Sequence, residues 1–528
     1  MKNIFKVPQT LVLSRKFFDS SATVIDKNRG FLEIIFLIFC SLGLVYLLAQ
    51  KAYAAFGAVL LLIFGLVLLI NPMAINYLLL IMVPFPWLFM FGSRIRAVLL
   101  LTVIAFAYTI LKKLFQREYQ RFEPITNLFF VLLFLFALST FNSFDIIHSF
   151  LMMKTWIASL LFYYTIVSNI KTFQHAKTFI NILLVLGFIS GVLGLLQTLV
   201  SPVFFPEVTL GAFSAEDVDI AEGYKVIDTY RASGTFENGP RYAHFLLLPL
   251  GIAFTSLVQK KAMNKIWAIF LLVVISLGIV VSFTRAAIIF ALFYGVIYTV
   301  IENKWSAFFK LSAIAVIIAL ILLPLLFFIL PTKVVDTVSV RFKEQEPENE
   351  FEEEAPPSWI WRVAMNYVAF RTFLSHPFLG IGVATFGIRF WEMAQLYPIP
   401  WQKYREVSNM ISTYDFMDSH NAYATILAET GMFSFLAYII IFMITFRYLF
   451  FALRKSENLQ IKAWALGTII CFLILIIYWA IHEYLIAEAY TSMLPIIIAV
   501  ILKNLVKEEQ TEKTGQEIKD LDIILKRI

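Results

Sequence analysis

Runs of roughly 20 apolar residues recur along the chain, and no other feature constrains its fold as strongly. A helix of about 20 residues spans the hydrocarbon core of a bilayer. The pattern predicts an all-α polytopic integral membrane protein with about 12–14 transmembrane helices and a large, partly helical outer loop. The runs lie at about 31–49, 52–70, 73–92, 97–111, 126–140, 149–168, 178–200, 242–258, 266–283, 286–301, 307–330, 432–452, 463–481 and 484–502.

Composition agrees with a membrane protein and excludes other classes. Only 15% of the residues are charged, whereas soluble domains carry about 25%. The net charge of +7 could suggest a nucleic-acid partner, but Lys and Arg are scattered between the apolar runs instead of forming a basic patch. Cys40 and Cys471 both lie inside apolar runs, so neither a disulfide framework nor a cysteine metal site is expected.

The placement of Lys and Arg predicts the orientation, because cytoplasmic connections are enriched in these residues. With the N-terminus inside, the inner connections hold most of them, among them Lys112, Lys113, Arg117, Arg121, Lys260, Lys261, Arg454, Lys455 and Lys462. We therefore expect both termini in the cytoplasm: an arm at 1–30, a transmembrane domain at 31–502 and a charged helical tail at 503–528. Two long loops, 201–241 and 331–420, then lie on the outer face, where long ordered loops usually carry function.

The first outer loop ends in a segment suited to an anion. Arg231 and Arg241 flank a stretch in which Gly234, Gly239 and Pro240 predict a tight turn. Free backbone N–H groups beside guanidinium groups can hold a phosphate. The alternative is a pair of arginines that extend from the membrane interface to lipid headgroups.

Arg285 stands between two apolar runs with hardly any loop around it. A charge held so close to the membrane usually faces a wet cavity or a partner, although it can also anchor a helix end. The predicted orientation places Arg285 on the same outer side as Arg231 and Arg241, which favours a shared site.

The second outer loop has three parts before its final motif. The acidic stretch 344–354 is predicted to be solvated. Residues 358–375 mix aromatic side chains with arginines, which is typical of an amphipathic helix on a membrane surface. A turn with Gly380 and Gly382 follows.

The loop ends at Asp418, Ser419, His420 and Asn421. Histidine can accept a proton near neutral pH, and Asp418 could hold the His420 ring in one tautomer. The alternative is a helix-capping segment in which Asp418 or Ser419 is the cap. His376 and His420 are isolated from other ligand side chains, and no phosphate-cradling or dinucleotide motif occurs, so neither metal nor cofactor is predicted. His244 has no assigned role.

Four of these segments occur in an order that resembles the O-antigen ligase and polymerase family of bacterial polysaccharide assembly. They are Arg-Ala-Ser-Gly-Thr-Phe-Glu-Asn at 231–238, Ser-Phe-Thr-Arg-Ala at 282–286, His-Pro-Phe-Leu-Gly-Ile-Gly at 376–382, and Ser-His-Asn-Ala-Tyr at 419–423 with Ala-Glu-Thr-Gly at 428–431. Each motif alone is weak evidence for the family. Their order, spacing and predicted common side make the set specific.

The resemblance implies a glycosyltransferase of the bacterial inner membrane with a periplasmic active site, which uses neither nucleotide nor metal. It implies a polyprenyl (undecaprenyl) diphosphate-linked glycan as donor and an acceptor hydroxyl, such as that of lipid A–core, attacked directly with inversion. Arg231, Arg241 and Arg285 would hold the diphosphate, and His420 would act as base on the acceptor. Asp418, Asn421, Gly380 and Gly382 would support the site, and membrane lipids would surround it.

Besides a purely structural or scaffolding membrane protein, two other functions remain open. A polymerase of the same family would use the same donor with another carrier-linked glycan as acceptor. A transporter of polysaccharide or lipid carrier belongs to a different class. Transporters often carry ionisable residues at mid-membrane depth, whereas the polar residues here gather at the predicted outer ends of the helices.

Overall fold

The computed structural model describes residues 73–85, 90–91, 95–116, 122–199, 232–236, 239–259, 262–302, 358–398, 419–482, 485 and 489–525. The chain divides into two units. Almost all of the first, Met1–Pro72 with Phe91–Arg94, lies outside the described residues. The account below concerns the second, Met73–Met90 with Ile95–Ile528.

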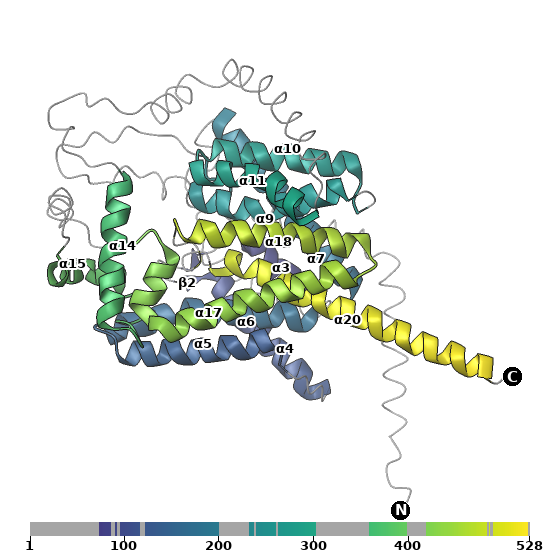
Figure 1. Ribbon diagram of the computed structural model, residues 1–528, viewed down its shortest axis with the longest axis horizontal. Coiled ribbons are helices and arrows are strands. Elements are labelled where there is room, and N and C mark those ends of the chain that lie inside the picture. The colour runs from purple at the N-terminus through teal and green to yellow at the C-terminus, as the bar shows by residue number, and fades with distance from the viewer. Residues whose placement is uncertain are drawn as a thin grey trace, which may run out of the picture. The chain divides into compact units, whose positions relative to one another are not determined.

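The described residues are almost wholly helical (Figure 1), as the apolar runs predicted. Two strands of two residues each, β1 (Met90–Phe91) and β2 (Ile95–Arg96), are the exceptions within this part of the chain. The helices are α3 (Ala74–Met82), α4 (Ala97–Gln116), α5 (Pro124–Phe141), α6 (Ile146–Asn169), α7 (Phe173–Leu199), α9 (Gly239–Val258), α10 (Lys265–Val281), α11 (Arg285–Glu302), α14 (Ser358–Ser375), α15 (Phe386–Leu396), α17 (Ala422–Lys455), α18 (Leu459–Trp479) and α20 (Ala489–Leu525).

Nine of the described helices are long and apolar enough to cross a membrane, namely α4, α5, α6, α7, α9, α11, α17, α18 and α20. Helix α10 is also apolar but shorter. The predicted class of all-α polytopic membrane protein is therefore confirmed. The runs predicted at 31–49, 52–70 and 307–330 lie outside the described residues.

Several helix boundaries follow from side-chain caps. Asp145, Asn264, Asn421 and Asn458 each precede a helix and accept a hydrogen bond from a backbone N–H of its first turn. Such a cap satisfies donors that have no partner inside the helix.

Helices α9, α18 and α20 lie deepest in the second unit, because most of the side chains in their apolar segments are buried. Helix α18 packs against α9, α11, α17 and α20, and α17 packs in turn against α5 and α20 (Figure 1). Helices α5 and α11 instead expose large apolar side chains such as Phe134 and Leu292. On a membrane helix this exposed surface is the natural contact for lipid.

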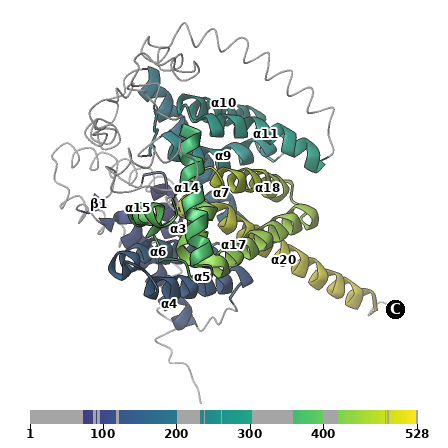
Figure 2. The same ribbon diagram turned by 60° about the vertical axis from the view of Figure 1, so that its left-hand side comes forward.

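Helix α14 confirms the helix predicted at 358–375 and shows how one of its faces is used. It stands across the direction of α17 (Figures 1 and 2) and packs against α15 and α17. Ala364, Met365 and Val368 are buried in a cluster with Phe386 and Phe390 of α15. Phe370 and Leu374 stay exposed on α14.

Two helix starts differ from the sequence expectation. Gly239 and Pro240 were predicted in a turn, but they open α9. Proline fits the first turn of a helix because its missing N–H would have no intrahelical partner there. Helix α17 begins at Ala422, ten residues before the predicted run at 432–452, and Gly431 interrupts it with a non-helical backbone (φ 75°).

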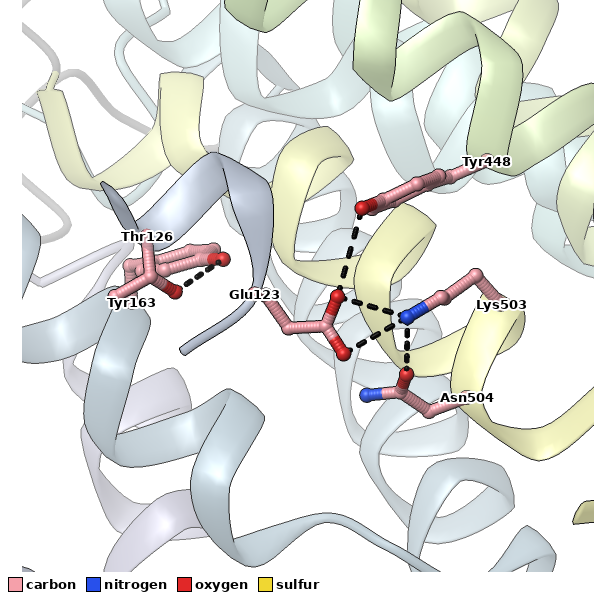
Figure 3. A network of polar contacts seen from close by, with 6 residues as sticks. All are labelled: Glu123, Thr126, Tyr163, Tyr448, Lys503 and Asn504. Atoms are coloured by element: carbon pink, nitrogen blue, oxygen red, sulfur yellow. Dashed lines mark hydrogen bonds and ion pairs between the residues drawn. The ribbon is translucent and has the colours of Figure 1, made fainter. Parts of the chain in front are cut away.

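A charged cluster joins three helices near the later part of α17 (Figure 3). The Lys503 ammonium of α20 binds both carboxylate oxygens of Glu123 at 2.8 and 2.7 Å, and Glu123 precedes α5. Lys503 also donates to Asn504, and the Tyr448 hydroxyl of α17 lies 3.5 Å from Glu123. The Lys503 side chain is 8% exposed, so this ion pair is largely buried.

Candidate active site

The turn at Ala232–Phe236 is fixed by a buried glutamine. Gln197 near the end of α7 accepts the backbone N–H of Ser233 at 3.1 Å and of Gly234 at 2.8 Å, and its amide donates to the Gly234 carbonyl at 3.1 Å. Gly234 has a φ of +56°, and a Cβ there would collide with the ring of Tyr242. Gln197 therefore holds the backbone directly after Arg231 in one conformation.

The same turn contacts the segment that leads to Arg285. The Ala232 N–H donates to the carbonyl of Val281 at 3.1 Å, at the end of α10. Ser282, Phe283 and Thr284 then form the short link to α11, which begins at Arg285. Two segments about 50 residues apart in sequence are thus held side by side. Arg285 is exposed at this link.

The turn at His376–Gly382 is seated on the break in α17. The Met432 N–H donates to Pro377 at 2.8 Å, and the N–H groups of Ile381 and Gly382 donate to Ala428 at 3.0 Å and Glu429 at 2.9 Å. These bonds use backbone groups that a continuous helix would keep for itself.

Glycine is required on both sides of this contact. Gly380 and Gly382 have φ values of +67° and +112°, and Gly431 has +75°. A Cβ on Gly380 would meet the backbone of Glu429, and one on Gly431 would meet the backbone of Phe378. The two motifs that contain these glycines are therefore shaped to fit each other.

The Glu429 side chain completes the contact from inside. It is 5% exposed, and its carboxylate accepts the N–H of Ala384 at 2.8 Å and of Phe386 at 3.1 Å, at the start of α15. Ser139 of α5 donates to the Glu429 carbonyl at 2.7 Å. One buried residue thus ties α5, α15 and α17 to the same turn.

His420 stands immediately before α17. Asn421 is the helix cap, since its side chain accepts the N–H groups of Tyr423 and Ala424. The cap is therefore neither Asp418 nor Ser419, the two residues predicted under the alternative interpretation. The Ser419 hydroxyl bonds to Thr425 at 2.8 Å, and the Ser419 carbonyl accepts from Asn366 of α14 at 3.2 Å.

Backbone strain gathers at these segments. Phe283, Ala384 and His420 are the non-glycine residues with positive φ in the described part of the chain, at 49°, 53° and 50°. A left-handed conformation of this kind costs of order 1–3 kcal/mol and persists only where the surroundings enforce it. Phe283 precedes Arg285 by two residues, Ala384 follows the turn at 376–382, and His420 is itself a predicted site residue.

The last turns of α18 connect the arginine side of the site with the histidine side. The Tyr423 hydroxyl, three residues after His420, donates to the Ile476 carbonyl at 2.7 Å. The indole N–H of Trp479 donates to the imidazole of His244 at 3.1 Å. His244 lies one turn after Arg241 on α9, so both segments are fastened to the same end of α18.

The structure places six of the eight predicted site residues. Arg231 and Asp418 lie outside the described residues. Arg241 is partly buried in the first turn of α9, Arg285 is exposed at the start of α11, and His420 and Asn421 are partly buried. Gly380 and Gly382 are buried at the turn that meets α17.

Sequence reasoning did not single out Gln197, and it included Glu429 and Tyr423 in the motifs at 428–431 and 419–423 without giving either a role. Gln197 lies inside the predicted run 178–200 and Glu429 just before the run 432–452, and polar side chains so close to a membrane are costly, which was a usable signal. The role of Tyr423 had no such signal, because its partner is a backbone carbonyl far along the chain. Within the described ranges, no three His, Cys, Asp or Glu side chains converge as metal ligands.

Comparison with known proteins adds the chemistry of the family. Residues 270–439 match the family described as O-antigen ligase. This range contains Arg285, the turn at 376–382, His420 and Glu429, whereas Arg231 and Arg241 precede it. No curated protein matches the chain. The motifs that resembled this family and the multi-pass helical fold agree with the match, and residues 270–439 are therefore similar to the O-antigen ligase family, a family of glycan-transferring membrane enzymes.

Proposed function

We propose that the protein transfers a glycan from a polyprenyl diphosphate carrier to an acceptor hydroxyl, at the periplasmic face of a bacterial inner membrane. The donor is carried by undecaprenyl, and the acceptor hydroxyl belongs to the lipid A–core of lipopolysaccharide. In the same orientation, both termini lie in the cytoplasm.

One observation carries this proposal. Helix α9, which bears Arg241, and helix α17, which begins two residues after His420, are both bonded to the last turns of α18. The Ala232–Val281 hydrogen bond adds the Arg285 segment to the arginine side. A cationic group of side chains and a histidine base thus share one end of the helix bundle.

The chemistry needs both groups. The acceptor oxygen forms a bond to the anomeric carbon of the donor sugar while the bond from that carbon to the phosphate oxygen breaks. The proton of the acceptor hydroxyl passes to His420. The electron pair of the broken bond stays on the diphosphate, whose charge Arg231, Arg241 and Arg285 stabilise. Direct attack inverts the configuration at the sugar.

Supporting residues set the geometry in this proposal. Asp418 orients the His420 ring, and Asn421 fixes the start of α17 directly after it. Gly380 and Gly382 allow the turn at 376–382 to approach the break in α17. An active site of this precision depends on such positioning groups.

The test uses variants in the native bacterium. Arg285→Ala and His420→Ala should abolish surface polysaccharide at normal membrane expression. Arg285→Lys should restore little of the surface polysaccharide, because a lysine cannot form the two parallel hydrogen bonds of a guanidinium group. His148→Ala, at the start of α6, is the matched histidine control and should leave the polysaccharide intact. Full polysaccharide in the His420 and Arg285 variants would refute the proposal.

The acceptor separates ligase from polymerase. A deletion strain that loses all long chains from the lipid core has lost a ligase. A strain whose chains stop at a single repeat unit has lost a polymerase that uses the same donor. The glycan ladder on a denaturing gel distinguishes the two results.

A further inference from the structure

A second region with ligand-binding character lies at the other end of the helices. A cavity of about 750 Å³ is formed where α9, α11 and α17 end and α18 begins. Arg241, Arg285 and His420 lie at the opposite ends of these same helices. The cavity is therefore separate from the candidate active site, and the inference below does not depend on the proposed function.

About half of the cavity wall is apolar and half is polar. Ile301, Phe450 and Leu453 line it, together with Val258 and Leu459. Cavities of about 300–1,000 Å³ with an apolar lining and a few polar groups are typical ligand sites. Because the wall belongs to the ends of membrane-spanning helices, an acyl chain can reach it directly from the bilayer.

Two cations stand at the cavity, and no salt bridge to either is found among the described residues. They are Arg454 and Lys462, which both line it. The Arg454 guanidinium lies 5.9 Å from the Phe450 ring centre. The adjacent carboxylate of Glu457 forms its ion pair with Lys513, and Lys462 interacts with it only at longer range. A phosphate group would satisfy two such cations.

A buried hydrogen-bond acceptor indicates that the ligand also carries a donor. The side-chain oxygen of Gln259, which also lines the cavity, is buried and receives no hydrogen bond within the described structure. A buried acceptor without a donor costs about 1–3 kcal/mol. A ligand that carries a hydroxyl near its phosphate would remove that cost.

We propose that this cavity binds an anionic glycerophospholipid with a hydroxyl-bearing headgroup, of the phosphatidylglycerol class. Its phosphate lies on Arg454 and Lys462, a headgroup hydroxyl donates to Gln259, and an acyl chain packs on Ile301 and Leu453. Among the described residues of the lining, Glu302 is the one carboxylate, so this lining is net positive, and a headgroup of one negative charge neutralises it.

The test titrates delipidated full-length protein in detergent with dioleoyl phosphatidylglycerol and counts bound lipids by native mass spectrometry. Phosphatidylglycerol should bind at least about tenfold more tightly than phosphatidylcholine, which has no net charge and no headgroup hydroxyl. Arg454→Gln/Lys462→Gln should lose at least about tenfold in affinity. Lys455→Gln removes a neighbouring cation that does not line the cavity, and it should bind as the wild type does.

Two further probes test the parts of the proposal separately. Gln259→Leu should weaken phosphatidylglycerol binding but leave phosphatidylmethanol binding unchanged, because phosphatidylmethanol has the same charge and no headgroup hydroxyl. Inorganic phosphate alone should not compete, since it lacks the acyl chain. Equal affinity for phosphatidylcholine, wild-type affinity of the double variant, an equal loss in Lys455→Gln, or saturable binding of inorganic phosphate would each overturn the proposal.

Discussion

Helix α17 is held at its two ends by different chemistry. Near its start, α17 is held by backbone hydrogen bonds between the turn at 376–382 and Ala428, Glu429 and Met432. The break in the helix at Gly431 allows these bonds to form. Near its end, two charged side chains, Glu123 and Lys503, join neighbouring helices (Figure 3).

The backbone contacts at the start of α17 position the chain precisely, whereas the ion pair near its end only holds helices together. An ion pair between flexible side chains stabilises the helices without specifying each backbone dihedral angle. Interlocking backbone bonds with left-handed residues specify the chain residue by residue, and they cost conformational strain. In the described structure that strain occurs in or beside the motif segments, at Phe283, Ala384 and His420. We therefore expect changes at the start of α17 to affect glycan transfer, and changes at the ion pair to affect stability alone.

The largest loss of stability is expected from Lys503→Met. The change leaves the Glu123 carboxylate without its partner in a site where the lysine is 8% and the glutamate 20% exposed. Breaking a buried ion pair costs about 3–5 kcal/mol. Thermal unfolding of the purified protein in detergent measures the loss, and the fraction that remains folded should keep its transfer activity.

The double variant Glu123→Gln/Lys503→Met is the control for this pair, because it leaves no unpaired charge. It should recover most of the lost stability. A double variant as unstable as Lys503→Met would mean that packing of the lysine chain, and not the charge, holds the helices.

Glu429→Ala should reduce both stability and transfer. It leaves the Ala384 and Phe386 N–H groups buried without an acceptor, at about 1–3 kcal/mol each. The start of α15 and the turn before it then lose their attachment to α17. Glu392→Ala is a matched control, since that carboxylate is exposed and pairs with Arg389 on the same helix. Unchanged activity in a folded Glu429→Ala protein would remove Glu429 from the positioning group.

Gly431→Ala should cost about 1–3 kcal/mol for the backbone alone, because φ 75° with ψ −177° is a conformation essentially restricted to glycine. The added Cβ also displaces the turn at Phe378, so transfer should fall more than stability does. Gly295→Ala, in the interior of α11, is the control and should be neutral or slightly stabilising, because alanine favours helix. Equal effects of the two substitutions on activity would contradict a special role for the break in α17.

The smallest effects compare two helix caps. Asn421→Ala and Asn458→Ala each remove a side chain that accepts N–H bonds at a helix start, at about 1 kcal/mol. Only Asn421 adjoins His420, so only its loss should lower the rate of glycan transfer. Parallel thermal unfolding and polysaccharide measurements on the two variants separate the effects. A similar fall in rate for Asn458→Ala would show that the two ends of α17 are not functionally distinct.

The sequence by itself determined the class of protein and the segments that matter. Runs of roughly 20 apolar residues leave helices as the structure that can satisfy every backbone group in lipid, so the all-α membrane fold followed from length and composition. The motifs around Arg285, the turn at 376–382 and His420 could also be recognised from the sequence, because charged and glycine residues are conspicuous at the ends of apolar runs. These motifs agree with the O-antigen ligase match at 270–439.

Only the tertiary structure decided how those segments meet. The bonds from Gln197 to Gly234, from Glu429 to Ala384 and from Tyr423 to Ile476 join residues between 37 and 53 positions apart. Hydropathy cannot predict such pairings, since it depends on local composition, whereas these bonds depend on which helix ends pack together. For the same reason, the start of α9 at Gly239 and the break in α17 at Gly431 emerged only from the packed structure.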